Sequence, residues 1–451
     1  MRIPEIKIKS KYLWISILLV LISAFGLWKI HNHRSSSEMM LDRWTYYLLE
    51  ADRLVDGYRM PVAARSIALV YMGLYEVSRP FTDDFVMSLE ELIPNFKSID
   101  SSLWTNNLDR DAAINAYFFA MFNKLFFTAP SGLRSQFEQN YEHWRTVSKT
   151  EISDEAFTSS EEYGIMMAER IFNWSALDTL AHQGHLHNYD RNYKVGDKPG
   201  DWKPSQNFAM PALLPYWGKI KTMIVDKEAY LARPLPPYST NVNSVYYAQA
   251  LELVTMSRPL SNEDKWIAEF WSDDQPGITF SPAGRWVNIT RQILAGSKYS
   301  FETAVEAYLK LSLALSDGAV VCWRSKYEYN FIRPETYIQQ VFDPNWEPLH
   351  HSPSFPSYPS GHSVIGAAAA EVLTQIFGQD YYFVDRSHED RVEFDGTPRE
   401  FSSFYDAAFE NAFSRLPLGV HFRMDCDEGL RIGFQLGKEI SRISLKGVPT
   451  S

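Results

Sequence analysis

Residues 359–377 read PSGHSVIGAAAAEVLTQIF, and this stretch predicts both a helical fold and the place of a site. Four consecutive alanines and several long apolar side chains give residues 367–377 a high helix propensity. The start of a helix offers free backbone N–H groups and a partial positive charge, which favour an oxyanion. Ser360 adds a hydroxyl donor, Gly361 lets an anion approach the backbone, and His362 can exchange a proton near neutral pH.

A second cluster lies upstream in the sequence KYEYNFIRP, residues 326–334. Lys326 and Arg333 are seven residues apart, which is two helical turns, so a single helix would present both cations on one side. Pro334 would then end that helix near Arg333. We expect the two cations to face the same ligand.

A third cluster lies downstream in the sequence SRLPLGVHFRMD, residues 414–425. His421 and Asp425 are four residues apart and would lie one above the other on a helix. A carboxylate in that place fixes the tautomer of the imidazole and raises its basicity. Arg415 adds a third, permanently charged group.

Together these clusters supply three cations, a hydroxyl, a helix start and two histidines. Three fixed positive groups favour a dianion or trianion over a carboxylate, so we predict a site for one tetrahedral oxyanion. One histidine would act as nucleophile or axial ligand, and the other as acid–base. The chemistry would be phosphoryl transfer, or catalysis on a bound phosphate mimic such as vanadate.

The pattern K-x6-R-P, P-S-G-H and S-R-x5-H-x3-D resembles the signature of the superfamily that joins type 2 phosphatidic acid phosphatases, bacterial acid phosphatases and vanadium haloperoxidases. Every signature position matches. The resemblance implies that the oxyanion is held by Lys326, Arg333, Ser360, the Gly361 N–H and Arg415. It implies His362 as the acid–base group. It implies His421 as the metal ligand of a vanadate cofactor, or as the phosphohistidine nucleophile of a phosphatase.

Features outside the signature favour the haloperoxidases within this superfamily. Lipid phosphatases of the superfamily have several membrane spans, whereas this chain has one terminal apolar run. The chain resembles haloperoxidases in its long helical region before the signature, and residues 266–274 are similar to bacterial haloperoxidases. We therefore expect a vanadium-dependent haloperoxidase that uses hydrogen peroxide and halide. The alternative is an exported acid phosphatase that hydrolyses phosphate monoesters through a phosphohistidine at His421.

Two aromatic residues are expected on the halide side of the site. Trp323 lies one helical turn before Lys326, and Phe355 lies five residues before Ser360. They resemble aromatic residues that border the halide in chloroperoxidases and bacterial iodoperoxidases, and rings can shield a reactive hypohalite from water. The alternative is that both pack in the core. Iodide is the first choice of halide and bromide the second.

Other polar residues are candidates for supporting roles around the site. Asp317, like Asp273 and Asp274, could support Lys326 or Arg333 from behind, as Asp425 could support His421. His350 and His351 could line the mouth of the pocket, although an ordinary loop role is the alternative.

The three histidines of the H-x2-H-x-H run at residues 182–187 match no common zinc spacing, so we expect exposed loop histidines there.

Composition excludes several classes of protein. The formal net charge of −11 and the pI near 5.5 argue against nucleic acid as a partner. The two cysteines, Cys322 and Cys426, form no disulfide framework and no cysteine-rich metal site. Two buried free thiols are expected, with a single bridge between them as the alternative.

The N-terminus predicts export. An apolar run at residues 12–28 follows a basic stretch at residues 2–11, which is typical of a signal peptide or a signal anchor within residues 1–34. The heavier positive charge upstream of the run directs the rest of the chain outward. We expect a periplasmic or extracellular protein, with residues 12–28 either removed or kept as a membrane anchor.

The remaining sequence predicts an all-α fold of two packed helical bundles. Apolar residues at helical spacing recur along the chain, for example within residues 114–125 and 304–315, and few segments alternate with period two. A proline-rich stretch at residues 199–237 interrupts the helices and predicts a connector. We expect an N-terminal bundle with this connector at residues 35–240, and the active bundle at residues 241–451.

Overall fold

A computed structural model describes residues 34–104, 107–205, 209–257, 259–273, 275–296 and 299–445. The predicted signal or anchor at residues 12–28 lies outside the described residues, as does Asp274. Among the described residues no helix is both long enough and apolar enough to cross a bilayer.

The described elements, in chain order, are almost all helical. The α-helices are α2 (Ser36–Leu54), α3 (Val62–Ser78), α4 (Arg110–Leu125), α5 (Ser131–Glu151), α6 (Asp154–Ala176), α7 (Thr179–His182), α8 (Val245–Met256), α9 (Asn262–Phe270), α10 (Pro282–Gly296), α11 (Phe301–Tyr329), α12 (Pro334–Val341), α13 (Gly361–Phe377), α14 (Phe404–Phe413), α15 (Arg415–Leu418) and α16 (Arg423–Ser441). The 3-10 turns are η1 (Arg79–Phe81), η2 (Leu89–Glu91), η3 (Ser101–Leu103), η4 (Gly184–Leu186) and η5 (Trp217–Lys219). Two short antiparallel pairs join β1 (Tyr189–Asp190) to β2 (Ala212–Leu213) and β3 (Phe383–Asp385) to β4 (Arg399–Phe401).

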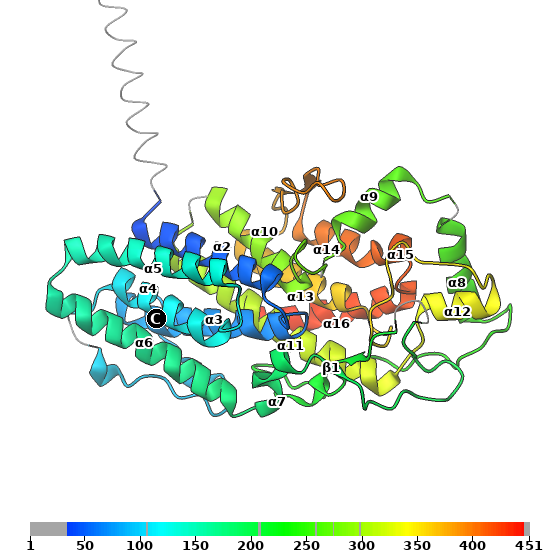
Figure 1. The fold of residues 1–451 in the computed structure, drawn as a ribbon, viewed down its shortest axis with the longest axis horizontal. Coiled ribbons are helices and arrows are strands. Elements are labelled where there is room, and N and C mark those ends of the chain that lie inside the picture. The colour runs from blue at the N-terminus through cyan, green and yellow to red at the C-terminus, as the bar shows by residue number, and fades with distance from the viewer. Residues whose placement is uncertain are drawn as a thin grey trace, which may run out of the picture.

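The helices form two packed groups, as predicted. Helices α2 to α6 gather at one end of the long axis, and α8, α9, α12 and α15 lie at the other (Figure 1). The helices α10, α11, α13 and α16 run between the two ends (Figure 1). The all-α fold of two bundles is therefore confirmed, while a boundary at residue 240 stays a prediction.

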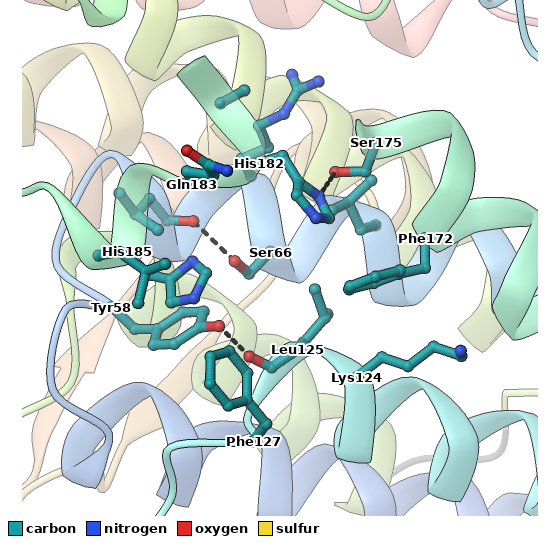
Figure 2. A pocket seen from close by; sticks show the side chains of 15 residues that line it. Tyr58, Ser66, Lys124, Leu125, Phe127, Phe172, Ser175, His182, Gln183 and His185 are labelled. Carbon is teal, nitrogen blue, oxygen red and sulfur yellow. Dashed lines mark hydrogen bonds between the residues drawn. The ribbon is translucent and has the colours of Figure 1, made fainter. Parts of the chain in front are cut away.

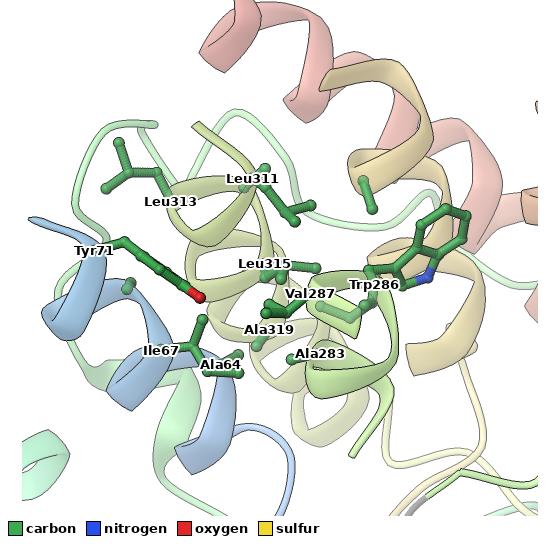
Figure 3. Close-up of a cluster of buried hydrophobic side chains, with 14 of the residues drawn as sticks. Ala64, Ile67, Tyr71, Ala283, Trp286, Val287, Leu311, Leu313, Leu315 and Ala319 are labelled. Carbon is green, nitrogen blue, oxygen red and sulfur yellow. The ribbon is translucent and has the colours of Figure 1, made fainter. Parts of the chain in front are cut away.

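Helix α11 joins the two groups, because it packs against α3 on one side and against α13 on the other. Figure 3 shows the apolar contact of α11 with α3 and α10, where Tyr71, Trp286 and Leu315 are buried together. Burying apolar surface stabilises a fold by about 25 cal/mol per Å² of area removed from water. This shared core therefore fixes the position of the two helix groups relative to each other.

Helices α13 and α16 approach backbone to backbone. A Cβ placed on Gly433 would lie 2.3 Å from the Val364 carbonyl oxygen, and one on Gly429 would lie 2.8 Å from the Ser360 carbonyl oxygen. No larger residue fits there without moving a helix. At the N-terminal ends of the two helices, the Ser360 N–H donates to the Asp425 carbonyl oxygen at 2.9 Å. This contact brings two of the predicted clusters together.

Lys326 and Arg333 do not share a helix, contrary to the prediction. Helix α11 ends at Tyr329, because Asn330 adopts the left-handed conformation (φ 46°) and its N–H bonds to the Lys326 carbonyl. Arg333 is extended and caps α12, with Pro334 in the first turn. Pro334 thus begins a helix where it was expected to end one, because a proline is well tolerated in the first turn.

The proline-rich connector packs against the second bundle through ion pairs and hydrogen bonds. The Arg233 guanidinium binds Glu428 of α16 at 2.7 Å, and the Ser205 hydroxyl donates to Glu335 of α12 at 2.8 Å. Asp317 belongs to this interface: its carboxylate accepts three backbone N–H bonds, from residues 223–225, at 2.7 to 3.0 Å. The prediction that Asp317 supports Lys326 or Arg333 is therefore wrong, since its carboxylate holds the connector.

We expect Gly433→Ala to lower the free energy of unfolding by about 1–3 kcal/mol, because the added methyl group forces α13 and α16 apart. Thermal unfolding followed by circular dichroism measures the effect. Gly132→Ala in α5 is the matched control, since a Cβ there meets nothing within 4 Å and alanine favours a helix. Equal melting temperatures for the two variants would contradict the close α13–α16 contact.

Candidate active site

Lys326 is held in place by three backbone carbonyls. Its Nζ donates to the carbonyl oxygens of Pro356, Ser357 and Pro359 at 3.0, 2.8 and 2.6 Å. The side chain is fully buried, and this burial lowers the pKa of Lys326 to about 7. The loop before α13 thus sets the position of an ammonium group that has no carboxylate partner within the described part of the chain.

Arg333 reaches the same loop from the turn between α11 and α12. Its Nε donates to the Phe355 carbonyl at 2.9 Å and its Nη1 to the Val420 carbonyl at 2.8 Å. Its Nη2 is buried and has no hydrogen-bond partner among the described residues. Burial lowers the pKa of Arg333 to about 10, so the group stays charged at neutral pH. An unpartnered buried N–H on a cation indicates room for an acceptor.

His421 is oriented by Asp425, as predicted, although His421 itself precedes α16. The Asp425 carboxylate lies 3.0 Å from His421 Nδ1, and it also accepts from the Ser357 hydroxyl at 2.5 Å. The carboxylate fixes a proton on Nδ1, which leaves a lone pair on Nε2. That Nε2 lies 3.3 Å from Arg333 Nη1, inside the ring of cations.

Arg415 and His362 face the same space from α15 and α13. Arg415 Nη1 lies 3.4 Å from His362 Nε2, while its Nη2 donates to the Trp271 carbonyl at 2.5 Å. Burial, followed by the charge of Arg415, lowers the pKa of His362 well below its usual value. The imidazole is therefore neutral and able to accept a proton, whereas the sequence indicated exchange near neutral pH. A bound anion would raise this pKa again.

The N-terminus of α13 lies among these groups. Ser360 caps the helix, with its hydroxyl accepting from the Ser363 N–H at 3.4 Å. The glycine that follows has little space above it: a Cβ on Gly361 would lie 2.8 Å from the Met60 methyl carbon and 3.7 Å from the Trp323 ring. A side chain at residue 361 would push the Met60 methyl group aside, whereas glycine lets a ligand approach the first-turn N–H closely.

A cavity of about 220 Å³ opens onto these residues. The walls combine side chains of both bundles and of the loops between them. They are Met60, Ser272, Asp273, Gln275, Pro282, Trp323, His350, His351, Pro353, Phe355, Gly361, His362, Arg415, Leu418, Val420 and His421.

The predicted aromatic pair lies in this wall. The ring centres of Trp323 and Phe355 are 5.0 Å apart, and Lys326 Nζ lies 5.0 Å from the Phe355 ring. The aromatic face is therefore in direct contact with the cations.

The site carries a surplus of positive charge. Lys326, Arg333 and Arg415 are buried together, and the nearby carboxylates are Asp425 and Asp273. Burial raises the pKa of Asp425 to about 6 and that of Asp273 to about 7. Burying unpaired cations is costly, so this arrangement is stabilised by a multiply charged anion.

The structure brings together the seven oxyanion and histidine residues that the sequence singled out, and it adds two more. Ser357 holds Asp425, and Met60 covers Gly361. The serines of the loop before α13 were a signal for Ser357, but nothing local pointed to Met60, which comes from the first bundle. The Asp273 carboxylate oxygen Oδ1 lies 3.5 Å from Arg285 Nη1, whereas Lys326 or Arg333 was expected as the partner of Asp273. His350 does line the cavity, with its Nδ1 2.7 Å from the Ser272 hydroxyl.

The two cysteines are free and buried, as expected.

A second cavity, of about 180 Å³, lies in the first bundle. Figure 2 shows His182 and His185 facing it, with the rings of Phe127 and Phe172 at its other sides. Both histidines are half-buried, contrary to the expectation of exposed loop residues, and burial lowers the pKa of each. His187 is exposed. Within the described residues no group of three or more potential ligands is placed to hold a metal ion.

The pKa of Lys326 predicts a pH effect on anion binding. Tungstate is a tetrahedral dianion of constant charge above neutral pH, and it would raise the pKa of Lys326 above about 7. Binding then takes up a proton, so we expect the affinity to fall by up to about tenfold per pH unit between about pH 7.5 and 9. Titration calorimetry in buffers of different ionisation enthalpy measures both quantities.

Lys326→Met is the control for this effect. We expect weaker tungstate binding and a flat pH dependence, because the titrating group is gone. A slope that persists in this variant would assign the proton to another group.

The comparisons with known proteins agree with this geometry. A family model for the VCPO second helical-bundle domain matches residues 306–447. The vanadium chloroperoxidase of Curvularia inaequalis is 22% identical over 277 residues, or 47% of this chain. That match spans about half the length (46%) of the relative.

Two solved structures are similar over most of the chain. A bacterial vanadium-dependent iodoperoxidase superposes with a TM-score of 0.77 and 27% identity, covering 91% of this chain and 98% of its own. The holo form of a bacterial vanadium-dependent chloroperoxidase superposes with a TM-score of 0.67 and 16% identity, covering 88% and 94%, and shows the fold alone. The matched second bundle and the likeness over nearly the whole iodoperoxidase support a vanadium haloperoxidase.

Proposed function

We propose that this protein is a vanadium-dependent haloperoxidase, which oxidises iodide or bromide with hydrogen peroxide to a hypohalite-type halogenating species. The observation that carries the proposal is the His421 Nε2 lone pair, placed within a ring of three buried cations at the base of an aromatic-lined cavity. The likeness to a bacterial iodoperoxidase and the match to the VCPO second helical-bundle domain support the same activity.

The donor set fits vanadate. Arg333 Nη2 is a buried donor without a partner among the described residues, and a Cβ on Gly361 would lie only 2.8 Å from the Met60 methyl carbon. A neutral imidazole nitrogen is a good ligand for a transition metal, whereas the cations match the oxygens. When bound, vanadate supplies a Lewis acid that activates peroxide without a change in its own oxidation state.

Each residue then has a role. The vanadate oxygens would be held by Lys326, Arg333, Arg415, the Ser360 hydroxyl and the Gly361 N–H.

His421 would bind the metal through Nε2, with Asp425 keeping the proton on Nδ1. His362 would take a proton from incoming peroxide, because burial and Arg415 keep its imidazole neutral. Lys326 would polarise the peroxide oxygen. Its pKa near 7 rises beside an anion, which restores the ammonium charge.

The halide would approach from the aromatic side. Trp323 and Phe355 form the part of the wall nearest to Lys326, so a soft, weakly hydrated halide meets apolar surface next to a cation. The same rings exclude water from a reactive product. Iodide, the halide most easily oxidised, is our first choice and bromide our second.

We also propose export to the periplasm or the cell exterior. The basic residues 2–11 and the apolar run at residues 12–28 support it, either as a removed signal or as a retained anchor. Halide oxidation outside the cytoplasm would keep hypohalite away from cellular thiols.

Two assays on the same preparation test the activity. After addition of orthovanadate, we expect triiodide to form with peroxide and iodide, and p-nitrophenyl phosphate to be hydrolysed weakly or not at all. Phosphatase turnover without halide oxidation would instead support the alternative, a phosphohistidine enzyme acting through His421.

The two histidines should separate cofactor retention from turnover. We expect His421→Ala to lose vanadium on dialysis, because it removes the metal ligand. We expect His362→Ala to keep vanadium but to lose about 10²–10⁴-fold in turnover, as general acid–base catalysis predicts. Elemental analysis beside the triiodide assay measures both. A His421→Ala protein that still oxidises iodide would refute the ligand role.

Asp425→Asn tests the support of His421. The amide has no negative charge, and its NH2 group can donate to Nδ1 and so shift the proton to Nε2. We therefore expect about 10–100-fold weaker vanadate binding by equilibrium dialysis. Asp427→Asn is the matched control, because Asp427 is exposed two residues further along α16. Equal affinity of the two variants would show that Asp425 does not orient the ligand.

A further inference from the structure

Met60 comes from the first bundle, yet it lies over the active site. It precedes α3 in the chain, is 4% exposed and lines the catalytic cavity. A Cβ on Gly361 would lie 2.8 Å from its methyl carbon. The thioether sulfur, bonded to that carbon, therefore lies beside the helix start that would hold the oxyanion.

The cavity would expose this sulfur to any oxidant formed inside it. One molecule confined to a space of about 220 Å³ corresponds to a concentration of several molar. Thioethers are oxidised to sulfoxides by two-electron oxidants such as hypohalous acids. Product formed between His362 and Phe355, which line the same cavity, would meet Met60 before it reached solvent.

We propose that Met60 is a self-oxidation site, at which hypohalite formed in the cavity converts the thioether to methionine sulfoxide. The inference rests on the proposed haloperoxidase function.

The sulfur donates an electron pair to the halogen of hypohalous acid, and hydroxide leaves. Water then adds to the halosulfonium, halide leaves, and two protons are released, of which the hydroxide takes one. The sulfur loses two electrons, the halogen gains them, and the halide returns to the cycle.

The sulfoxide would act on the site that produced it. The Met60 methyl carbon lies 2.8 Å from the place of a Cβ on Gly361, so an oxygen added to the neighbouring sulfur enlarges the side chain that fills this space. The sulfoxide oxygen also accepts hydrogen bonds and would compete with the oxyanion for the Gly361 N–H. Activity should therefore fall with the number of turnovers, and a methionine sulfoxide reductase should restore it.

Met39 provides an internal reference in the same chain. It lies in α2 and is 43% exposed, so it reports oxidant that has reached the solvent. The order in which Met60 and Met39 are oxidised therefore distinguishes oxidant formed in the cavity from oxidant added outside.

The first experiment uses the full chain loaded with vanadate, peroxide and iodide or bromide, with free methionine in the buffer to remove escaped oxidant. Peptide mass spectrometry should find that the oxidised fraction of Met60 is at least about tenfold that of Met39, and that Met60 is oxidised only when halide is present. In oxygen-18 water the Met60 sulfoxide should carry the heavy isotope. Reagent hypohalite added to resting protein should oxidise Met39 first.

The inference would be overturned if the protein oxidised halide while Met60 stayed intact, or while Met60 was oxidised no faster than Met39. The proposed function would remain supported in either case. A parallel assay without triiodide or halogenated product would overturn the proposed function itself.

The second experiment compares Met60→Leu with Met39→Leu. Leucine keeps the side-chain volume but cannot be oxidised in this way. With each rate divided by its own initial value, Met60→Leu should sustain several-fold more turnovers than wild type, while Met39→Leu should decline as wild type does. Equal decline per turnover in Met60→Leu and wild type would overturn the inference.

Discussion

The contact between α13 and α16 is the constraint on which the site depends. Gly429 and Gly433 leave no room for a side chain between the two helices, so the backbones meet. The Ser360 N–H then reaches the Asp425 carbonyl, and the two helices start at the same place. One start supplies N–H groups for an anion, and the other supplies the carboxylate that orients His421. A shift of one helix relative to the other would move these two groups apart.

The cations are held by neutral carbonyl groups. Lys326 donates to three backbone carbonyls of the loop before α13, and Arg333 donates to two. Carbonyl dipoles fix a cation in place without cancelling its charge, whereas a carboxylate would form a closed ion pair. Burial, followed by the neighbouring positive charge, lowers the pKa of Lys326 and of His362. The same surplus of charge would favour multiply charged oxyanions. Backbone carbonyl groups thus set the position of the cations, while the cationic side chains set the charge of the site.

The sequence predicted which residues form the site, but it predicted their local backbone structure less well. The three clusters converge, as their chemical content predicted, and Trp323 and Phe355 line one cavity wall. The single helix expected through Arg333 does not exist, because Asn330 ends α11 in a left-handed turn, which asparagine tolerates well but which the spacing of the two cations does not reveal. The prediction for Asp317 was wrong because a buried carboxylate near the signature has two possible kinds of partner, cations or backbone N–H groups. Only the packing of the chain decides between them.

By itself the sequence determined the fold class and predicted an anion site with the residues that converge there, because helix propensity and side-chain chemistry are local properties. The tertiary structure alone decided which groups meet. It placed Met60 of the first bundle over Gly361, turned Asp317 toward the connector and paired Asp273 with Arg285. These contacts join residues far apart in the chain, and they follow from how α3, α10, α11 and α13 pack around a shared core, which no local pattern encodes.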